Sequence, residues 1–199
     1  MTLPPNAPAE IVRMGTFGTF YHRFDELLAE SSTLAVYFIH SRRWRENHDA
    51  AIKAFLKRGG NLEVFLPDLE NHELMFSLVR HFDDGPLILS LVADAYRYFA
   101  RLARDYQKPA HLWLFGKYPT YSFYRFDQRA VMALYSNTAA KKELPAFEVE
   151  NGSTLGTFLT HDIADLRKES RRKMPVDLET VIRNAPDAPD LYGQDFSDE

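Results

Sequence analysis

The sequence contains no cysteine among its 199 residues. A disulfide framework, a thiolate zinc site, an iron–sulfur cluster and a thiol nucleophile are therefore excluded. No uninterrupted apolar run approaches the roughly 20 residues that a membrane-spanning helix needs. The first eight residues, MTLPPNAP, also lack the basic start and apolar stretch of a secretory signal. We therefore expect a cytoplasmic protein that has no membrane partner.

Neither sign of charge is in large excess, because 24 Lys and Arg stand against 28 Asp and Glu, a net charge of −4. This balance provides no general attraction to nucleic acid or to anionic lipid. Nucleic acid is therefore not favoured as a partner, and any anion site must be local. None of the seven histidines has the spacing of zinc ligands, so we expect neither a metal nor another cofactor.

The length and the 45% hydrophobic content are sufficient for one domain with a substantial core. Residues 1–9, which contain three prolines, are expected to form a flexible arm. Residues 10–173 are expected to form the domain. Residues 174–199 carry seven acidic residues against one arginine and are expected to be a loosely ordered tail. Such a tail either increases solubility or folds back on a basic surface.

Hydrophobic spacing predicts an α/β order in the first third of the chain. A helix is expected around 17–28, followed by a short strand at Leu34–Ile39. Asn47 is expected to cap the next helix, which the two glycines at 59–60 end. A second strand at Asn61–Leu66 completes a β-α-β unit, whose strands should be parallel.

The rest of the chain has the pattern of two helices, a run of strands and a last helix. The helices are expected over 71–82 and 88–106, and the strand-like runs are 111–115, 121–126, 130–135 and 146–149. Short links between these runs favour antiparallel pairing. The last helix is expected to begin near Ser153, to bury Phe158 and to end in the basic stretch 167–173. The predicted fold is a single α/β domain with a mixed sheet flanked by helices on both faces.

Ligands of open α/β sheets bind beyond the carboxyl ends of parallel strands. Arg42, Arg43, Trp44 and Arg45 follow the first predicted strand directly and precede a predicted helix N-terminus. Guanidinium groups and free backbone N–H groups suit a phosphate, and a tryptophan ring can stack on a base. The alternative is an exposed loop whose arginines pair with carboxylates or solvent and whose tryptophan packs against the protein.

Catalytic groups are harder to assign. His40 and His48 are candidate bases, and Asp68, which follows the second strand, and Asp127 are candidate partners. The run 152–156, GSTLG, has the spacing of a nucleophile elbow, but the elbow uses serine at its centre and follows a buried strand. Helix capping explains this serine and threonine better.

Two stretches resemble the phospholipase D-like superfamily. Leu34–Asp68 is similar to its opening β-α-β unit, with a strand, a loop, a helix that ends at glycine and a strand that ends at aspartate. Thr120–Asp127 (TYSFYRFD) and the following Ala130–Asn137 (AVMALYSN) resemble its signature, in which His-x-Lys-x-x-x-x-Asp precedes a strand with a Gly-Ser-x-Asn-type turn. By position, Thr120 replaces the histidine, Ser122 replaces the lysine, and Asp127 matches the aspartate.

The resemblance implies an altered function, because in that family the histidine attacks a phosphodiester and the lysine stabilises charge on the oxygens. Threonine cannot replace imidazole as nucleophile and proton carrier without a neighbouring base. We therefore expect a non-hydrolytic binding or sensing module. Its ligand would be a phosphorylated small molecule or nucleotide, held by the arginines and by Thr120, Ser122, Tyr124 and Asn137.

Several alternatives remain open. The hydroxyl-bearing residues of this strand could be ordinary strand residues. A phosphodiesterase, nuclease or transferase with a rearranged His/Asp site is a second function, and a protein-interaction scaffold is a third. The resemblance also implies a homodimer and a role in bacterial regulation or defence.

Overall fold

The computed structural model describes residues 11–82, 85–106, 111–136, 143–173, 180, 181 and 183. Its strands are β1 (Arg13–Thr16), β2 (Thr33–Tyr37), β3 (Asn61–Pro67), β4 (His111–Phe115), β5 (Tyr121–Arg125), β6 (Arg129–Leu134), β7 (Pro145–Glu150) and β8 (Arg171–Lys173). In the described part of the chain they form one eight-stranded sheet in the order β1-β7-β6-β5-β2-β3-β4-β8. Strands β2, β3 and β4 are parallel, and the other neighbours are antiparallel. The predicted mixed sheet is confirmed.

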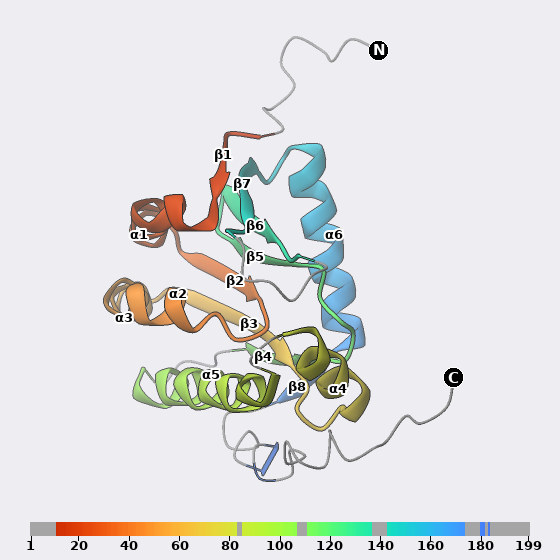
Figure 1. Ribbon diagram of the computed structural model, residues 1–199. Coiled ribbons are helices and arrows are strands. Elements are labelled where there is room, and N and C mark those ends of the chain that lie inside the picture. Colours follow the sequence, from red (N-terminus) through yellow and green to blue (C-terminus); the bar gives the residue numbers. More distant parts are fainter. Residues whose placement is uncertain are drawn as a thin grey trace.

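Helices lie on both faces of this sheet (Figure 1). They are the 3-10 turn η1 (Phe17–Phe20) and the helices α1 (Tyr21–Glu30), α2 (Arg42–Asn47), α3 (Asp49–Lys57), α4 (His72–His81), α5 (Gly85–Asp105) and α6 (Thr154–Glu169). Helices α1, α3 and α5 line one face, and α6 runs along the other (Figure 1). None of the described helices combines the length and apolarity that crossing a bilayer requires.

The predicted β-α-β unit is present, with β2 and β3 parallel from Thr33↔Asn61 onward. One part of the prediction is wrong. The stretch after β2 forms the short helix α2 and not a loop. Asn47 is the last residue of this helix and does not cap the next one. His48 occupies the N-cap position of α3. A helix turns successive residues by about 100°, so the side chains of α2 are divided between the core and solvent.

The second half of the sheet also follows the predicted order. Strands β5, β6 and β7 form an antiparallel meander. Strand β4 instead lies parallel to β3, because α4 and α5 connect these two strands and provide a crossover long enough for parallel pairing. Asn71 begins α4, where its side chain accepts a 3.0 Å hydrogen bond from the Leu74 N–H.

The two edge strands were not predicted, because β1 and β8 are short and β8 consists of three basic residues. Helix α6 ends at Glu169, so the basic stretch does not continue the helix as expected. Phe158 is 48% exposed and not buried. The expected arm at 1–9 and most of the tail lie outside the described residues, but Val181 is fully buried and belongs to the core.

Candidate functional site

The carboxyl end of β2 has an unusual backbone conformation. Ser41 has a φ of 46°, the one positive value among the described residues other than glycine. This left-handed conformation costs a serine about 1–3 kcal/mol and is enriched at functional sites. It turns the chain sharply from β2 into α2, where the Ser41 carbonyl accepts the first helical hydrogen bond from the Arg45 N–H at 3.0 Å. The surrounding packing therefore holds this turn in place.

Four hydroxyl groups gather beside this turn, and we call them the hydroxyl cluster. The Ser41 and Tyr124 hydroxyls hydrogen-bond each other, and Ser122 hydrogen-bonds both Tyr124 and Tyr135. The Ile39 N–H donates to the Tyr135 hydroxyl at 3.3 Å. Desolvation raises the pKa of Tyr124 and raises that of Tyr135 to about 12, against the lowering effect of these hydrogen bonds. Both phenols are therefore neutral near pH 7 and cannot act as bases there.

His40 lies at the same edge and is half-buried. Its Nδ1 accepts a 3.2 Å hydrogen bond from the Arg42 N–H, so Nε2 carries the proton of the neutral ring. Desolvation, together with the positive charges of Arg45 and Arg42, lowers the pKa of His40 to about 4, against an opposing effect of Asp94. The imidazole is therefore neutral near pH 7, and its two arginine neighbours each have a carboxylate partner, Glu46 for Arg42 and Asp94 for Arg45.

The arginines and the tryptophan of α2 divide into a buried and an exposed pair, so Trp44 and Arg45, contrary to the expectation from the sequence, do not face a ligand. Arg45 is 3% exposed, donates to the His40 carbonyl at 2.9 Å and to Asp94 at 2.8 Å, and lies 5.2 Å from the Tyr98 ring centre. Trp44 is also 3% exposed and packs against Tyr124, with the ring centres 4.7 Å apart. Because both side chains point inward, Trp44 cannot stack on a ligand. Arg45 cannot contact a ligand directly, and instead it holds the His40 carbonyl and Asp94 in place.

The two remaining arginines face solvent. Arg42 is 55% exposed and pairs with the equally exposed Glu46 at 2.7 Å. Arg43 is exposed, and none of the described residues forms a hydrogen bond or ion pair with it. An exposed ion pair contributes only about 0–1 kcal/mol, so a ligand phosphate can compete with Glu46. These two guanidinium groups are the cations of the edge that remain available to an anion.

The residues matched to the superfamily signature at and before β5 also include one exposed residue, Thr120, and one buried residue, Ser122. Thr120 is exposed, just before the strand, and its carbonyl accepts a 2.9 Å hydrogen bond from the Tyr135 N–H. Ser122 is 4% exposed and belongs to the hydroxyl cluster. Asn137 lies outside the described residues. Tyr135 and Ser41 were not identified from the sequence, because only the pairing of β5 with β2 and β6 brings them to Tyr124.

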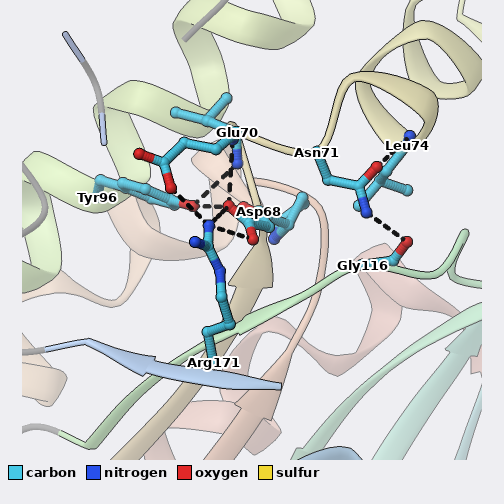
Figure 2. A network of polar contacts seen from close by, with 9 residues as sticks. Asp68, Glu70, Asn71, Leu74, Tyr96, Gly116 and Arg171 are labelled. Carbon is cyan, nitrogen blue, oxygen red and sulfur yellow. Dashed lines mark hydrogen bonds and ion pairs between the residues drawn. The ribbon is translucent and has the colours of Figure 1, made fainter. Parts of the chain in front are cut away.

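Asp68 takes part in a structural network at the end of β3 (Figure 2). Its carboxylate pairs with Arg171 of β8 and accepts a 3.1 Å hydrogen bond from the Glu70 N–H. Arg171 also contacts the Glu70 carboxylate at 2.7 Å, and the Tyr96 hydroxyl donates to the Pro67 carbonyl at 2.5 Å. Asp68 therefore holds the edge strand β8 in place and has no histidine among its described partners.

Asp127 lies at the opposite end of β2 from His40. Its carboxylate accepts hydrogen bonds from the backbone N–H groups of Ser32 and Thr33, both at 2.8 Å, and from their hydroxyls. Desolvation alone would raise the pKa of Asp127, but these hydrogen bonds together lower it. Thr33 begins β2 and His40 lies three residues after its end at Tyr37, so the length of the strand, about 13 Å, separates the two ends. Asp127 therefore fixes the start of β2 and cannot assist His40.

His48 is 2% exposed and lies between the rings of Tyr21, Phe24 and Trp44. Its Nδ1 is 2.7 Å from a carboxylate oxygen of Asp25. His48 therefore lies in the core with Asp25 as its carboxylate partner, and among the described contacts neither Asp68 nor Asp127 pairs with His48 or His40. Among the described residues, no group of three or more histidine, aspartate or glutamate side chains is close enough to hold a metal ion.

No family model matches the sequence, and no curated protein matches it. Solved structures with a similar fold include TrmBL2, an archaeal chromatin protein that shows a novel mode of DNA binding (TM-score 0.53, 10% identity, 86% of this chain and 57% of that one). They also include phosphatidylserine synthase of Haemophilus influenzae Rd KW20 (TM-score 0.52, 14% identity, 80% and 40%). A third is Nuc of Salmonella typhimurium, a phospholipase D family member (TM-score 0.46, 10% identity, 81% and 96%).

The similarity to TrmBL2 and to the synthase shows that this chain shares their fold, and membership of the phospholipase D-like superfamily stays a prediction. This chain spans 57% of TrmBL2 and 40% of the synthase, so it matches only part of either protein. At these identities the similarity concerns the fold alone. The homodimer, the bacterial source and the cytoplasmic location stay predictions.

Proposed function

We propose that this chain is a non-hydrolytic binding module that holds a phosphorylated small molecule, such as a nucleotide, at the carboxyl end of β2. The observation that carries the proposal is the pair of exposed guanidinium groups, Arg42 and Arg43, beside the half-buried His40. Desolvation, together with the positive charges of Arg45 and Arg42, lowers the pKa of His40 to about 4. A bound phosphate would have Arg42 and Arg43 as its direct partners.

The absence of an activated nucleophile among the described residues at this edge supports binding without hydrolysis. Thr120 is exposed, and no described residue hydrogen-bonds its hydroxyl. Ser122, Ser41 and the two tyrosines hydrogen-bond one another, and the phenols are neutral near pH 7. An unassisted hydroxyl is a poor nucleophile at this pH. Ser122 and Tyr124 are also buried, at 4% and 1% exposure, so these hydroxyls support the edge from inside and are not placed to attack phosphorus.

The proposal is tested by ligand-induced stabilisation in a thermal unfolding assay. AMP, ribose 5-phosphate and inorganic phosphate are compared with adenosine and ribose, which lack the phosphate. A ligand at 100 times its dissociation constant should stabilise the protein by about 2.7 kcal/mol. The double variant Arg42→Gln, Arg43→Gln should weaken phosphate binding by a factor on the order of 10 to 100 for each guanidinium group removed.

The matched control is Lys117→Gln, Lys168→Gln, which removes the same charge from side chains that are 79% and 75% exposed. It should bind like the unmodified protein, and both double variants should keep their thermal stability without ligand. Equal stabilisation by phosphorylated and unphosphorylated ligands, or an unchanged affinity in the arginine variant, would refute the site. Hydrolysis of a phosphodiester that is lost on His40→Gln would refute the non-hydrolytic assignment.

A further inference from the structure

A second basic surface lies on α5, at the edge of the helical layer (Figure 1). Arg97, Arg101 and Arg104 are all exposed, and we call these three residues the arginine row. Their spacing of four and three residues places them on one side of the helix, about one turn apart. The opposite side of the helix packs into the core through fully buried residues such as Tyr96 and Phe99. The arginine row is therefore presented on a rigid support.

Few described carboxylates neutralise this row. Arg97 has no ion pair with any described residue, and Arg101 lies 5.9 Å from the ring centre of its neighbour Tyr98. Among the described residues, the ion-pair partner of Arg104 is the adjacent Asp105, at 3.6 Å, and both side chains are largely exposed. Asp94, one turn before Arg97, is already paired with the buried Arg45. Within the described part of the chain, the outer side of α5 therefore carries positive charge that few carboxylates neutralise, although the chain as a whole is acidic.

The other exposed residues of α5 indicate what kind of partner fits. Ser90 and Asp94 continue the outer side toward the N-terminus, and Leu87, 48% exposed, is the one large apolar side chain of the helix that is exposed among those described. A protein partner would need a buried apolar or aromatic anchor, and a lipid surface would need an inserted apolar face. The row offers neither. Tyr98 is 7% exposed, so the row has no free ring on which an unpaired base could stack.

We infer that the arginine row binds the phosphate backbone of double-stranded nucleic acid without reading its sequence. Arg97 to Arg104 spans about 10 Å along the helix. One strand of a duplex places phosphates about 3.4 Å apart along its axis, so the row matches about three steps of that strand. One guanidinium group can donate two parallel hydrogen bonds to the oxygens of one phosphate. The net charge of −4 does not prevent this contact, since charges beyond about 10 Å are largely screened at physiological salt.

The test measures binding of the full chain to a short duplex DNA of random sequence by fluorescence anisotropy over a range of salt concentrations. Three phosphate contacts predict a slope of log affinity against log salt of about −2.7, or about 40-fold weaker binding at 200 mM than at 50 mM salt. The variant Arg97→Gln, Arg101→Gln, Arg104→Gln should lose at least about tenfold in affinity at low salt, with a slope near zero. These side chains are exposed, so circular dichroism should show an unchanged fold.

The control variant is Arg13→Gln, Lys117→Gln, Lys168→Gln, which removes the same charge from exposed positions on other elements. It should keep most of the affinity and the slope. Equal weakening in both triple variants would mean that net charge alone attracts DNA and would overturn the inference. No DNA binding at low salt, or binding only to anionic lipid vesicles, would also overturn it. The Arg42→Gln, Arg43→Gln variant should bind DNA normally, which separates this surface from the proposed phosphate site.

Discussion

Replacing Arg23 by methionine is expected to lower the free energy of unfolding by about 3–5 kcal/mol, the largest effect that we predict for a single residue. Arg23 of α1 forms a two-pronged ion pair with Glu148 of β7, with Nε–O distances of 3.1 Å and an Nη2–O distance of 2.7 Å. The Glu148 side chain is only 1% exposed, and its next cation, Arg13, is 4.0 Å away. Methionine would leave a buried carboxylate without its main partner, and urea unfolding at pH 7 measures the loss.

Two further variants make this prediction specific. Glu26→Gln removes only the exposed partner of the same arginine, at 2.8 Å, and should cost less than about 1 kcal/mol. Arg23→Met combined with Glu148→Leu removes both charges and should recover most of the stability, because an apolar pair can replace a buried ion pair at little cost. A loss below about 1 kcal/mol in Arg23→Met alone would mean that water reaches Glu148.

Gly156→Ala is expected to destabilise the protein by about 1–3 kcal/mol, even though alanine favours helices. A Cβ atom at this position would lie 2.1 Å from the Glu150 carbonyl oxygen and 2.6 Å from the Asn151 Cα. Both are backbone atoms, so the start of α6 would have to move. The Glu150 carbonyl also accepts hydrogen bonds from the Ser153 N–H at 3.0 Å and from the Ser153 hydroxyl at 2.7 Å, and these would be strained.

Gly152→Ala is the matched control, because a Cβ atom there would meet nothing within 4 Å. Its unfolding free energy should change by less than about 0.5 kcal/mol. Thermal unfolding of the two variants side by side gives the comparison. Equal stabilities would show that the first turn of α6 can move away from β7 at no cost, contrary to the close approach of Gly156 to the Glu150 carbonyl.

The sequence was sufficient to predict the elements with strong local signals. Short, mostly apolar runs at 34–39 and 61–66 predicted β2 and β3, and the cap at Ser153 is confirmed, since its hydroxyl accepts a 3.1 Å hydrogen bond from the Gly156 N–H. That contact also explains why the run 152–156 only mimics a nucleophile elbow. Such features depend on residues a few positions apart, which is why a single sequence reveals them.

The candidate site could not be predicted in the same way, because it depends on contacts between residues that are far apart in the sequence. The prediction of a loop after β2 was wrong because 42–47 winds into a helix, which turned Trp44 and Arg45 inward. Asp127 and Asp68 received structural roles from Ser32 and Arg171, which are 95 and 103 residues away. Only the order of strands in the sheet brings these partners together, so the roles of both aspartates had to come from the structure.

The most direct test of the proposed phosphate site is the titration of the His40 ring, followed by NMR with and without inorganic phosphate at constant ionic strength. In the free protein His40 should titrate near pH 4, well below the ordinary histidine value of 6.5. The neutral ring is therefore favoured on folding, so stability should fall as the pH drops from about 6.5 toward 4. Bound phosphate should raise the His40 pKa, and phosphate should accordingly bind more tightly as the pH falls through that range. A free His40 that titrates near 6.5, or a pKa that saturating phosphate leaves unchanged, would contradict the account.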